Sequence, residues 1–152
     1  MKQENNMEKT IYAKLNKIQQ ELDVPKNREN KFGKYKYRSC EDIIEAVKPL
    51  LGDCVLLLSD EMVLIGDRFY VKATAKLTNG KNEITNSAFA REAEIKKGMD
   101  ASQITGATSS YARKYALNGL FGIDDVKDAD TQDNTTQEQE NKKQDLSDSF
   151  EM

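Results

Sequence analysis

An alternating run of side chains from residue 69 to residue 78 constrains the fold of this chain more than any other stretch. Apolar residues occupy its odd-numbered positions, and lysines, threonines and a tyrosine occupy its even-numbered positions. This period predicts a strand with one buried and one solvent-facing side. The pair Asn79-Gly80 follows and favours a two-residue type I′ hairpin turn, because both residues tolerate a positive φ. We expect a return strand from about residue 81 to 90.

Two shorter apolar runs precede this strand, at residues 55–58 and 61–65. Ser59-Asp60 separates them, so we expect two short strands here, and Gly66-Asp67 is the next predicted turn. Helical patterns lie on both sides of this strand-rich region. Strands grouped between helices predict an α+β fold, with an antiparallel β-meander and helices packed on one of its faces.

A long helix is predicted from Asp100 to Asn118. Asp100 and Gln103 have the spacing of a capping box, and Gly119 offers a left-handed stop. At about 100° per residue, one stripe is expected to face the core; it comprises Ile104, Ala107, Thr108, Tyr111 and Tyr115. The opposite stripe comprises Ser102, Gln103, Gly106, Ser109, Ser110, Arg113 and Lys114.

The composition of that second stripe is unlike an ordinary solvent face, which is usually rich in Glu and Lys pairs. Small hydroxyl side chains and a glycine allow another backbone to approach closely and donate hydrogen bonds. Phosphate oxygens accept such bonds, and Arg113 and Lys114 would add positive charge. The alternative is that the small residues simply permit close helix packing.

Residues 26–38 form a basic segment with interleaved aromatic rings. Six cations and three aromatic residues are opposed by Glu29 alone. In an extended segment from Lys34 to Tyr37, the two tyrosines share one side and the two lysines the other. Cations beside exposed rings suit single-stranded nucleic acid, because the rings stack on bases and the cations neutralise phosphates. The alternative is a solvated loop whose tyrosines point inward.

Two other helices are expected. Apolar residues at helical spacing predict an amphipathic helix from about residue 7 to 22, whose stripe serves either the core or a subunit contact. Ser39 and Asp42 predict a capping box that opens a short helix ahead of Pro49, with Ile43, Ile44 and Val47 pointing inward. Cys40, in the first turn, is expected to be buried and inert.

The chain has 152 residues, enough for one domain with a core. Through Lys127 it carries 21 Lys and Arg against 18 Asp and Glu, whereas residues 128–152 carry 2 against 8. We therefore expect a mildly basic domain at residues 1–127 and a disordered acidic tail at residues 128–152. Leu146, Phe150 and Met152 are the apolar residues that interrupt this segment towards its end.

Several functional classes are disfavoured by what the sequence lacks. Without histidine, the usual zinc sites, Ser-His-Asp triads and Cys-His pairs are excluded, and we expect no catalytic residue, metal or cofactor. No P-loop motif is present, which argues against an ATP-driven motor. Cys40 and Cys54, with no signal peptide or membrane span, favour a reduced cytoplasmic setting.

Three motifs together resemble the essential recombination function (ERF) family of phage single-strand annealing proteins. These are KFGKYKY at residues 31–37, MDASQ at 99–103 and SSYARKYAL at 109–117, continued by FGIDD at 121–125. The resemblance covers roughly residues 10 to 130. It implies a β-β-β-α core, binding of single-stranded DNA, annealing without ATP, and assembly into homo-oligomeric rings or filaments in the host cytoplasm.

The predicted DNA-binding surface combines three kinds of side chain. Phosphate contacts are assigned to Lys31, Lys34, Lys36, Arg38, Arg91, Lys96, Lys97, Arg113 and Lys114. Hydrogen-bond donors are Gln103, Ser109 and Ser110, and the stacking residues are Tyr35 and Tyr37. Tyr111 and Tyr115 are placed mainly in the core.

Other functions stay open. A passive single-strand coat would use the same surface, and Asp67 with Glu94-Ile95-Lys96 loosely fits the acid and lysine pattern of metal-dependent nucleases. Asp124 and Asp125 are more simply a solvated exit from the domain than a metal site. The acidic tail is either a solubilising segment, a competitor for the basic surface, or a peptide handle ending near Phe150, with a single-strand-binding protein as a candidate partner.

Overall fold

The computed structural model describes residues 10–123. Its elements, in order, are helix α2 (Ile11–Glu21), strands β1 (Arg28–Asn30) and β2 (Tyr35–Tyr37), helix α3 (Cys40–Val47), the 3-10 turn η1 (Lys48–Leu50), strands β3 (Val55–Ile65), β4 (Arg68–Thr78) and β5 (Glu83–Arg91), and helix α4 (Ala101–Phe121). The expected domain boundary at Lys127, the acidic tail and the beginning of the first predicted helix lie outside the described residues.

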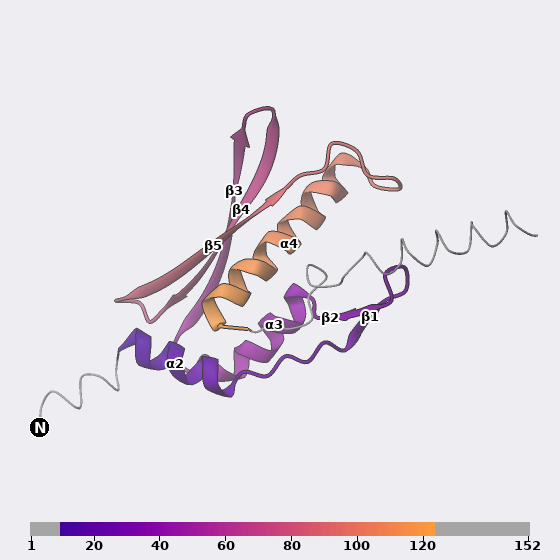
Figure 1. Ribbon diagram of the computed structural model, residues 1–152. Helices are drawn as coiled ribbons and strands as arrows, with labels where there is room; N and C mark the ends of the chain where they lie inside the picture. Colours follow the sequence, from indigo (N-terminus) through magenta and orange to yellow (C-terminus); the bar gives the residue numbers. More distant parts are fainter. Residues whose placement is uncertain (1–9, 124–152) are drawn as a thin grey trace, which may run out of the picture.

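The main sheet is an antiparallel meander in the order β3-β4-β5, and α4 lies across one of its faces (Figure 1). The alternation in β4 explains why. Its odd-numbered residues from Val71 to Leu77 are fully buried beneath the helices, while Lys72, Thr74 and Lys76 lie on the opposite face. The predicted α+β fold with helices on one face of a meander is therefore confirmed.

Strand β3 corrects the expectation of two short strands. It runs unbroken for 11 residues, and Ser59 and Asp60 sit within its pairing to β4. Asp60 pairs with the buried Ala73, so its carboxylate points to the helix-covered face. The strand tolerates this charge because Arg113 of α4 hydrogen-bonds both carboxylate oxygens.

The β4–β5 hairpin is confirmed, but the predicted turn type is wrong. Asn79 does not take a positive φ, although Gly80 does, at 92°. Strand pairing closes at Thr78 and Glu83, which leaves four residues in the loop. The side chain of Asn79 accepts hydrogen bonds from the backbone N–H groups of Lys81 and Asn82, and this local capping replaces the two-residue turn.

Helix α4 begins as predicted and ends later than predicted. Asp100 and Gln103 form the expected capping box. The helix passes Gly119 and stops at Gly122, which takes the left-handed φ of 63°. Gly119 serves packing instead, since a Cβ atom there would lie 2.3 Å from the side-chain nitrogen of Asn86. That nitrogen donates to the carbonyl of Ala116, joining β5 to α4 at 2.9 Å.

The buried face of α4 is rotated from the predicted stripe. Ile104 is buried as expected, but Tyr111 is 53% exposed and Ala107 is also exposed. The core side of the helix comprises Ile104, Ala112, Ala116, Leu117, Asn118, Leu120 and Phe121. Alanines at 112 and 116 share the core with Ala73 and Ala75 of β4. Small side chains on both elements let the helix approach the sheet closely, and no room is left there for tyrosine.

Helices α2 and α3 complete the core at the C-terminal half of α4. Ile11 and Ile18 of α2 are buried, so this stripe serves the core. The side chain of Gln19 also donates to the carbonyl of Leu120 at 2.9 Å. The α3 capping box is confirmed, and Cys40 is buried as expected, with its thiol pKa raised by burial.

Candidate nucleic-acid interface

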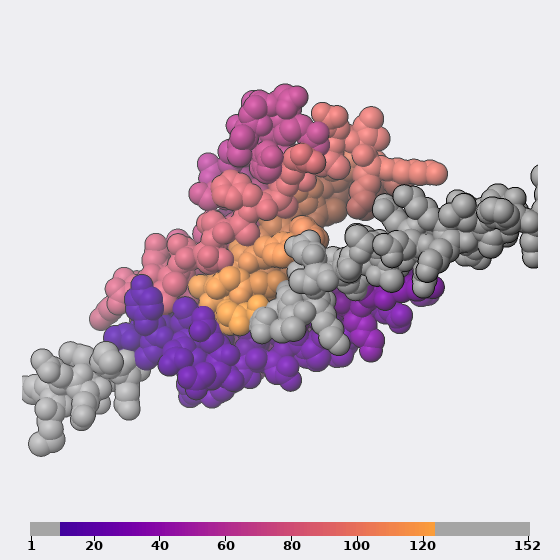
Figure 2. Space-filling model, viewed as in Figure 1, coloured from indigo at the N-terminus to yellow at the C-terminus, as the bar shows by residue number. Residues whose placement is uncertain are grey.

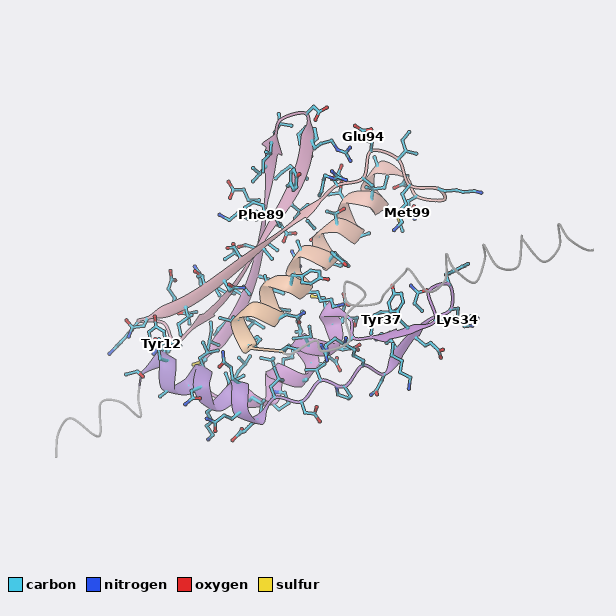
Figure 3. All side chains as sticks on the ribbon, viewed as in Figure 1. Tyr12, Lys34, Tyr37, Phe89, Glu94 and Met99 are labelled. Carbon is cyan, nitrogen blue, oxygen red and sulfur yellow. The ribbon has the colours of Figure 1, made fainter. Side chains whose placement is uncertain are left out.

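The predicted basic loop is a two-stranded hairpin of β1 and β2 that projects beside α4 (Figure 3). Tyr35 and Tyr37 lie on one side, with ring centroids 6.2 Å apart and an angle of 61° between the rings. The hydroxyl of Tyr35 accepts a hydrogen bond from the Asn30 side chain at 2.9 Å. Gly33 makes room for this ring, because a Cβ atom there would lie 2.3 Å from it.

An ion pair fastens the hairpin to α3. Arg28 donates from Nε and an amino nitrogen to the two carboxylate oxygens of Asp42, at 2.7 and 3.0 Å. The guanidinium and the backbone N–H of Ser39 hold the pKa of the Asp42 carboxyl well below its usual range. The same carboxylate thus caps α3 and anchors β1, which sets the position of the tyrosines.

A second aromatic pair lies on the exposed side of α4. Tyr111 and Tyr115, one helical turn apart, meet edge to face with centroids 4.9 Å apart, and their hydroxyl groups lie 3.1 Å from each other. The ammonium group of Lys114 lies 5.9 Å from the centroid of the Tyr115 ring. Three neighbouring residues of the helix therefore present two rings and a cation away from the core.

The β2 tyrosines and Tyr111 border a hollow of about 390 Å³ between β2 and α4, lined among others by Tyr35, Lys36, Tyr37, Ser110, Tyr111 and Lys114. A smaller hollow of about 190 Å³ continues along α4 and is lined by Arg91, Lys96 and Ile104 among others. Ala107 and Tyr111 line both. We call the two hollows together the α4 groove. Its two ends carry cations and its middle carries an aromatic ring.

Comparison with known proteins decides the family. The model of the ERF superfamily matches residues 11–150. The chain belongs to the ERF superfamily. It is 67% identical over 132 residues to the "Essential recombination function protein" of Salmonella phage P22, an alignment that covers 87% of this chain. The ERF chain spans 64% of the length of that relative. No solved structure matches it.

Within this ERF domain, Arg113 and Ser109 do not line the α4 groove, contrary to the prediction that they share a face with Lys114. Arg113 donates to both carboxylate oxygens of Asp60 at 2.9 and 3.1 Å, and Ser109 donates to one of them. Burial raises the pKa of Asp60, but these hydrogen bonds outweigh it and hold that pKa below its ordinary value. The prediction placed Arg113 and Lys114 on one stripe, but adjacent helical residues lie about 100° apart. Once the helix is docked, Arg113 faces Asp60 of β3 and Lys114 faces the groove.

Two further residues predicted to contact DNA form hydrogen bonds within the protein instead. Arg38 is only 7% exposed, and its Nε donates to the carbonyl of Val24 at 2.8 Å. The side-chain oxygen of Gln103 accepts from the backbone N–H of Asp100 at 3.0 Å, which completes the helix cap. We therefore leave both residues, with Arg113 and Ser109, out of the proposed DNA surface.

Five of the other predicted cations are exposed on two segments that flank α4. Lys31, Lys34 and Lys36 belong to the β1–β2 hairpin, while Lys96 and Lys97 follow β5 in the loop that leads to α4. Figure 3 shows Lys34 on the hairpin and Met99 in that loop on the same side of the molecule. The fold thus places Lys36 and Lys96, about 60 residues apart in the ERF chain, at the two adjoining hollows of the α4 groove.

Tyr111 and Lys26 line the α4 groove but are not among the predicted DNA-binding residues. Tyr115 lines neither hollow and contacts Tyr111. The tyrosines were assigned to the core because they fit an apolar helical stripe. A hydroxyl-bearing ring beside Lys114 was the available signal that they face solvent. Lys26 belonged to the basic segment but was not singled out within it.

Residues 10–123 of this ERF protein include the acidic residues and the lysine of the nuclease-like pattern. No group of three or more His, Cys, Asp or Glu side chains in that range could hold a metal ion. Glu94, one residue of the nuclease-like pattern, lies 3.8 Å from a guanidinium nitrogen of Arg68. None of the described helices is both long enough and apolar enough to cross a membrane.

Proposed function

We propose that this chain is a phage-type recombination protein that binds single-stranded DNA and anneals complementary strands without ATP, as a homo-oligomer. One observation carries the proposal: the α4 groove has cations at both ends and tyrosines between them. Membership of the ERF superfamily and the similarity to a phage protein named for a recombination function support it.

Phosphate binding is the first element of the mechanism. Lys36 and Lys114 serve the wider end of the groove, and Arg91 and Lys96 serve the narrower end. Each neutralised phosphate releases counterions, so affinity should fall with salt, by about 0.7 log units per log unit of salt for each contact on a single strand. Four contacts per subunit predict a slope of about −3.

Annealing itself requires no bond to form or break, so the proposal needs no general acid, base or metal. The groove has to hold phosphates and leave most base edges free to meet a complementary strand. Each such site is weak, and an oligomer that repeats it along the strand makes the binding collectively strong.

Two features of the main sheet support self-association. Among residues 10–123, β3 pairs with β4 alone, so one edge of an 11-residue strand has no partner. Met62, Leu64 and Phe69, on the helix-facing side of the β3–β4 hairpin, are 49–59% exposed. The hairpin tip stands clear of the helices (Figure 2). Open edges and clustered apolar side chains are typical of protein interfaces.

The binding test compares two double variants of equal charge. Lys36→Ala/Lys114→Ala removes two groove cations, and Lys17→Ala/Lys81→Ala removes two exposed lysines that line neither hollow. Fluorescence anisotropy with a labelled single strand should show a weaker affinity and a salt slope smaller by about 1.4 for the groove variant. Equal effects of the two variants would refute the groove as the binding surface.

Annealing is tested by mixing complementary labelled strands with and without the protein, in the absence of ATP. The proposal expects faster duplex formation. Slower formation would identify a passive coat instead, and magnesium-dependent loss of the labelled strands would identify a nuclease. A role for the acidic segment at residues 128–152, and a single-strand-binding protein as partner, stay predictions; deleting that segment in the same assay tests the first.

A further inference from the structure

The wider hollow of the α4 groove has the size and lining of a small-molecule site. Its volume of about 390 Å³ falls within the range of about 300–1,000 Å³ that is usual for ligand pockets. It is bounded by β2 on one side and by α4 on the other. Electrostatic contact with a DNA backbone does not require such a hollow. The hollow therefore suits a ligand group that can enter it.

Both walls of the hollow are aromatic and are held in place before any ligand arrives. On the hairpin side, the Asn30 side chain fixes the hydroxyl of Tyr35, and the absence of a side chain at Gly33 lets its ring lie close to the turn. On the helix side, the contact between their hydroxyl groups holds Tyr111 against Tyr115. Rings that need no rearrangement lose little entropy on binding a planar ligand.

The polar groups around these rings match a nucleotide. Besides the buried Arg38, the lining carries Lys26, Lys36 and Lys114 against the single carboxylate of Glu41. Lysines suit the phosphates on either side of an inserted base. The carboxylate of Glu41 accepts hydrogen bonds from amino groups, and the hydroxyl of Ser110 both donates and accepts them, as base edges require.

We infer that the wider hollow binds one nucleobase that has left the stack of a bound single strand, between the tyrosines of β2 and Tyr111. This inference rests on the proposed function, because it concerns the same strand in the same groove. The inserted base anchors the strand on each subunit. The nucleotides beyond it follow the narrower hollow, where the lining offers Arg91, Lys96 and small side chains, and their base edges stay available for pairing.

The test separates base binding from phosphate binding. A single-stranded oligonucleotide and an abasic strand of the same length carry the same phosphates, but only the first has bases. For the wild-type chain, we expect the abasic strand to bind about 5- to 150-fold more weakly, the range for loss of one stacked base. Both strands should show the same salt slope.

Two variants test whether the preference for the normal strand over the abasic strand depends on the wider hollow. Tyr111→Leu removes one wall, and Ser110→Leu keeps every tyrosine but fills part of the space; both positions are exposed, so both variants should fold. Each should weaken binding of the normal strand and leave binding of the abasic strand unchanged. Tyr12→Leu, at a tyrosine of α2 that is 68% exposed and lies outside the groove, is the matched control and should behave as wild type.

The outcomes distinguish this inference from the function on which it rests. If the wild-type chain binds both strands equally, the inference fails while single-strand binding stands. If the wild-type chain prefers the normal strand and Tyr111→Leu and Ser110→Leu retain the full preference, the bases are bound elsewhere and the inference also fails. If neither strand binds, the proposed function itself is wrong.

Discussion

Arg113 and Lys114 are adjacent in the sequence, and the structure predicts that their removal has opposite consequences. Arg113 makes two charge-assisted hydrogen bonds to Asp60 of β3, at 2.9 and 3.1 Å. Lys114 lines the α4 groove. We therefore expect Arg113→Ala to lower the stability of the fold and to leave DNA affinity nearly unchanged. Lys114→Ala should do the reverse.

The magnitude follows from the exposure of the ion pair. The side chains of Arg113 and Asp60 are 36% and 28% exposed, so solvent screens part of their attraction. Without the two hydrogen bonds from Arg113, the carboxylate of Asp60 retains the hydroxyl of Ser109 as a side-chain donor. Arg113→Ala should then cost about 1–2 kcal/mol, which lowers the melting temperature of a domain of this size by about 4–8 °C.

Lys114→Ala should change stability by less than about 0.5 kcal/mol, as is usual for surface positions. It should reduce the salt slope of single-strand binding by about 0.7, the contribution of one phosphate contact. Thermal denaturation and anisotropy titrations on the same two preparations measure both effects. If Arg113→Ala weakened DNA binding as much as Lys114→Ala and left the melting temperature unchanged, the assignment of Arg113 to the Asp60 pair would be refuted.

Three further predictions concern the fold and its assembly. Gly106→Ala should stabilise the protein by up to about 1 kcal/mol, because alanine has the higher helix propensity and nothing lies within 4 Å of the new Cβ atom. Gly119→Ala on the same helix should instead destabilise the protein, because its Cβ atom displaces Asn86. Urea midpoints that rose for both variants would contradict this pair of predictions. The pKa of Asp60 is lowered in the folded state. The stability that Asp60 contributes is therefore fully present above the unfolded pKa of about 3.9 and is lost as the pH falls through the folded-state value, so wild type and Asp60→Asn should converge in stability as the pH falls below about 3.9. Leu64→Glu, at a position 59% exposed, should reduce the oligomer size measured by light scattering while the circular dichroism spectrum is retained; an unchanged size would remove the β3–β4 hairpin tip from the interface.

Features that depend on a few neighbouring residues could be predicted from the sequence. Both capping boxes, at Ser39 and Asp100, formed as expected because each uses a backbone N–H only three residues away. The alternation of β4 and its hairpin to β5 also held, since a period of two places every second residue on the buried face. The grouping of strands between helices was sufficient for the α+β architecture.

The errors occurred where a distant residue decides the outcome. Asp60 was expected to interrupt a strand, but its partner Arg113 lies 53 positions away and neutralises it. Gly119 was expected to end α4, but it accommodates Asn86 of β5, so the helix continues to Phe121. Neither partner can be identified from local pattern, because each contact exists only after the helix has docked on the sheet.

By itself, then, the sequence determined which segments become helices and strands and that two basic segments exist, because hydrogen bonding along the backbone and residue periodicity are local. Only the tertiary structure decided how α4 is rotated. Alanines at 112 and 116 let the helix pack closely on β4, and this rotation turns Tyr111 and Lys114 towards β2 and Arg113 towards Asp60. Close packing of small side chains, which carries little signal in a hydrophobic pattern, thereby sets which residues line the α4 groove.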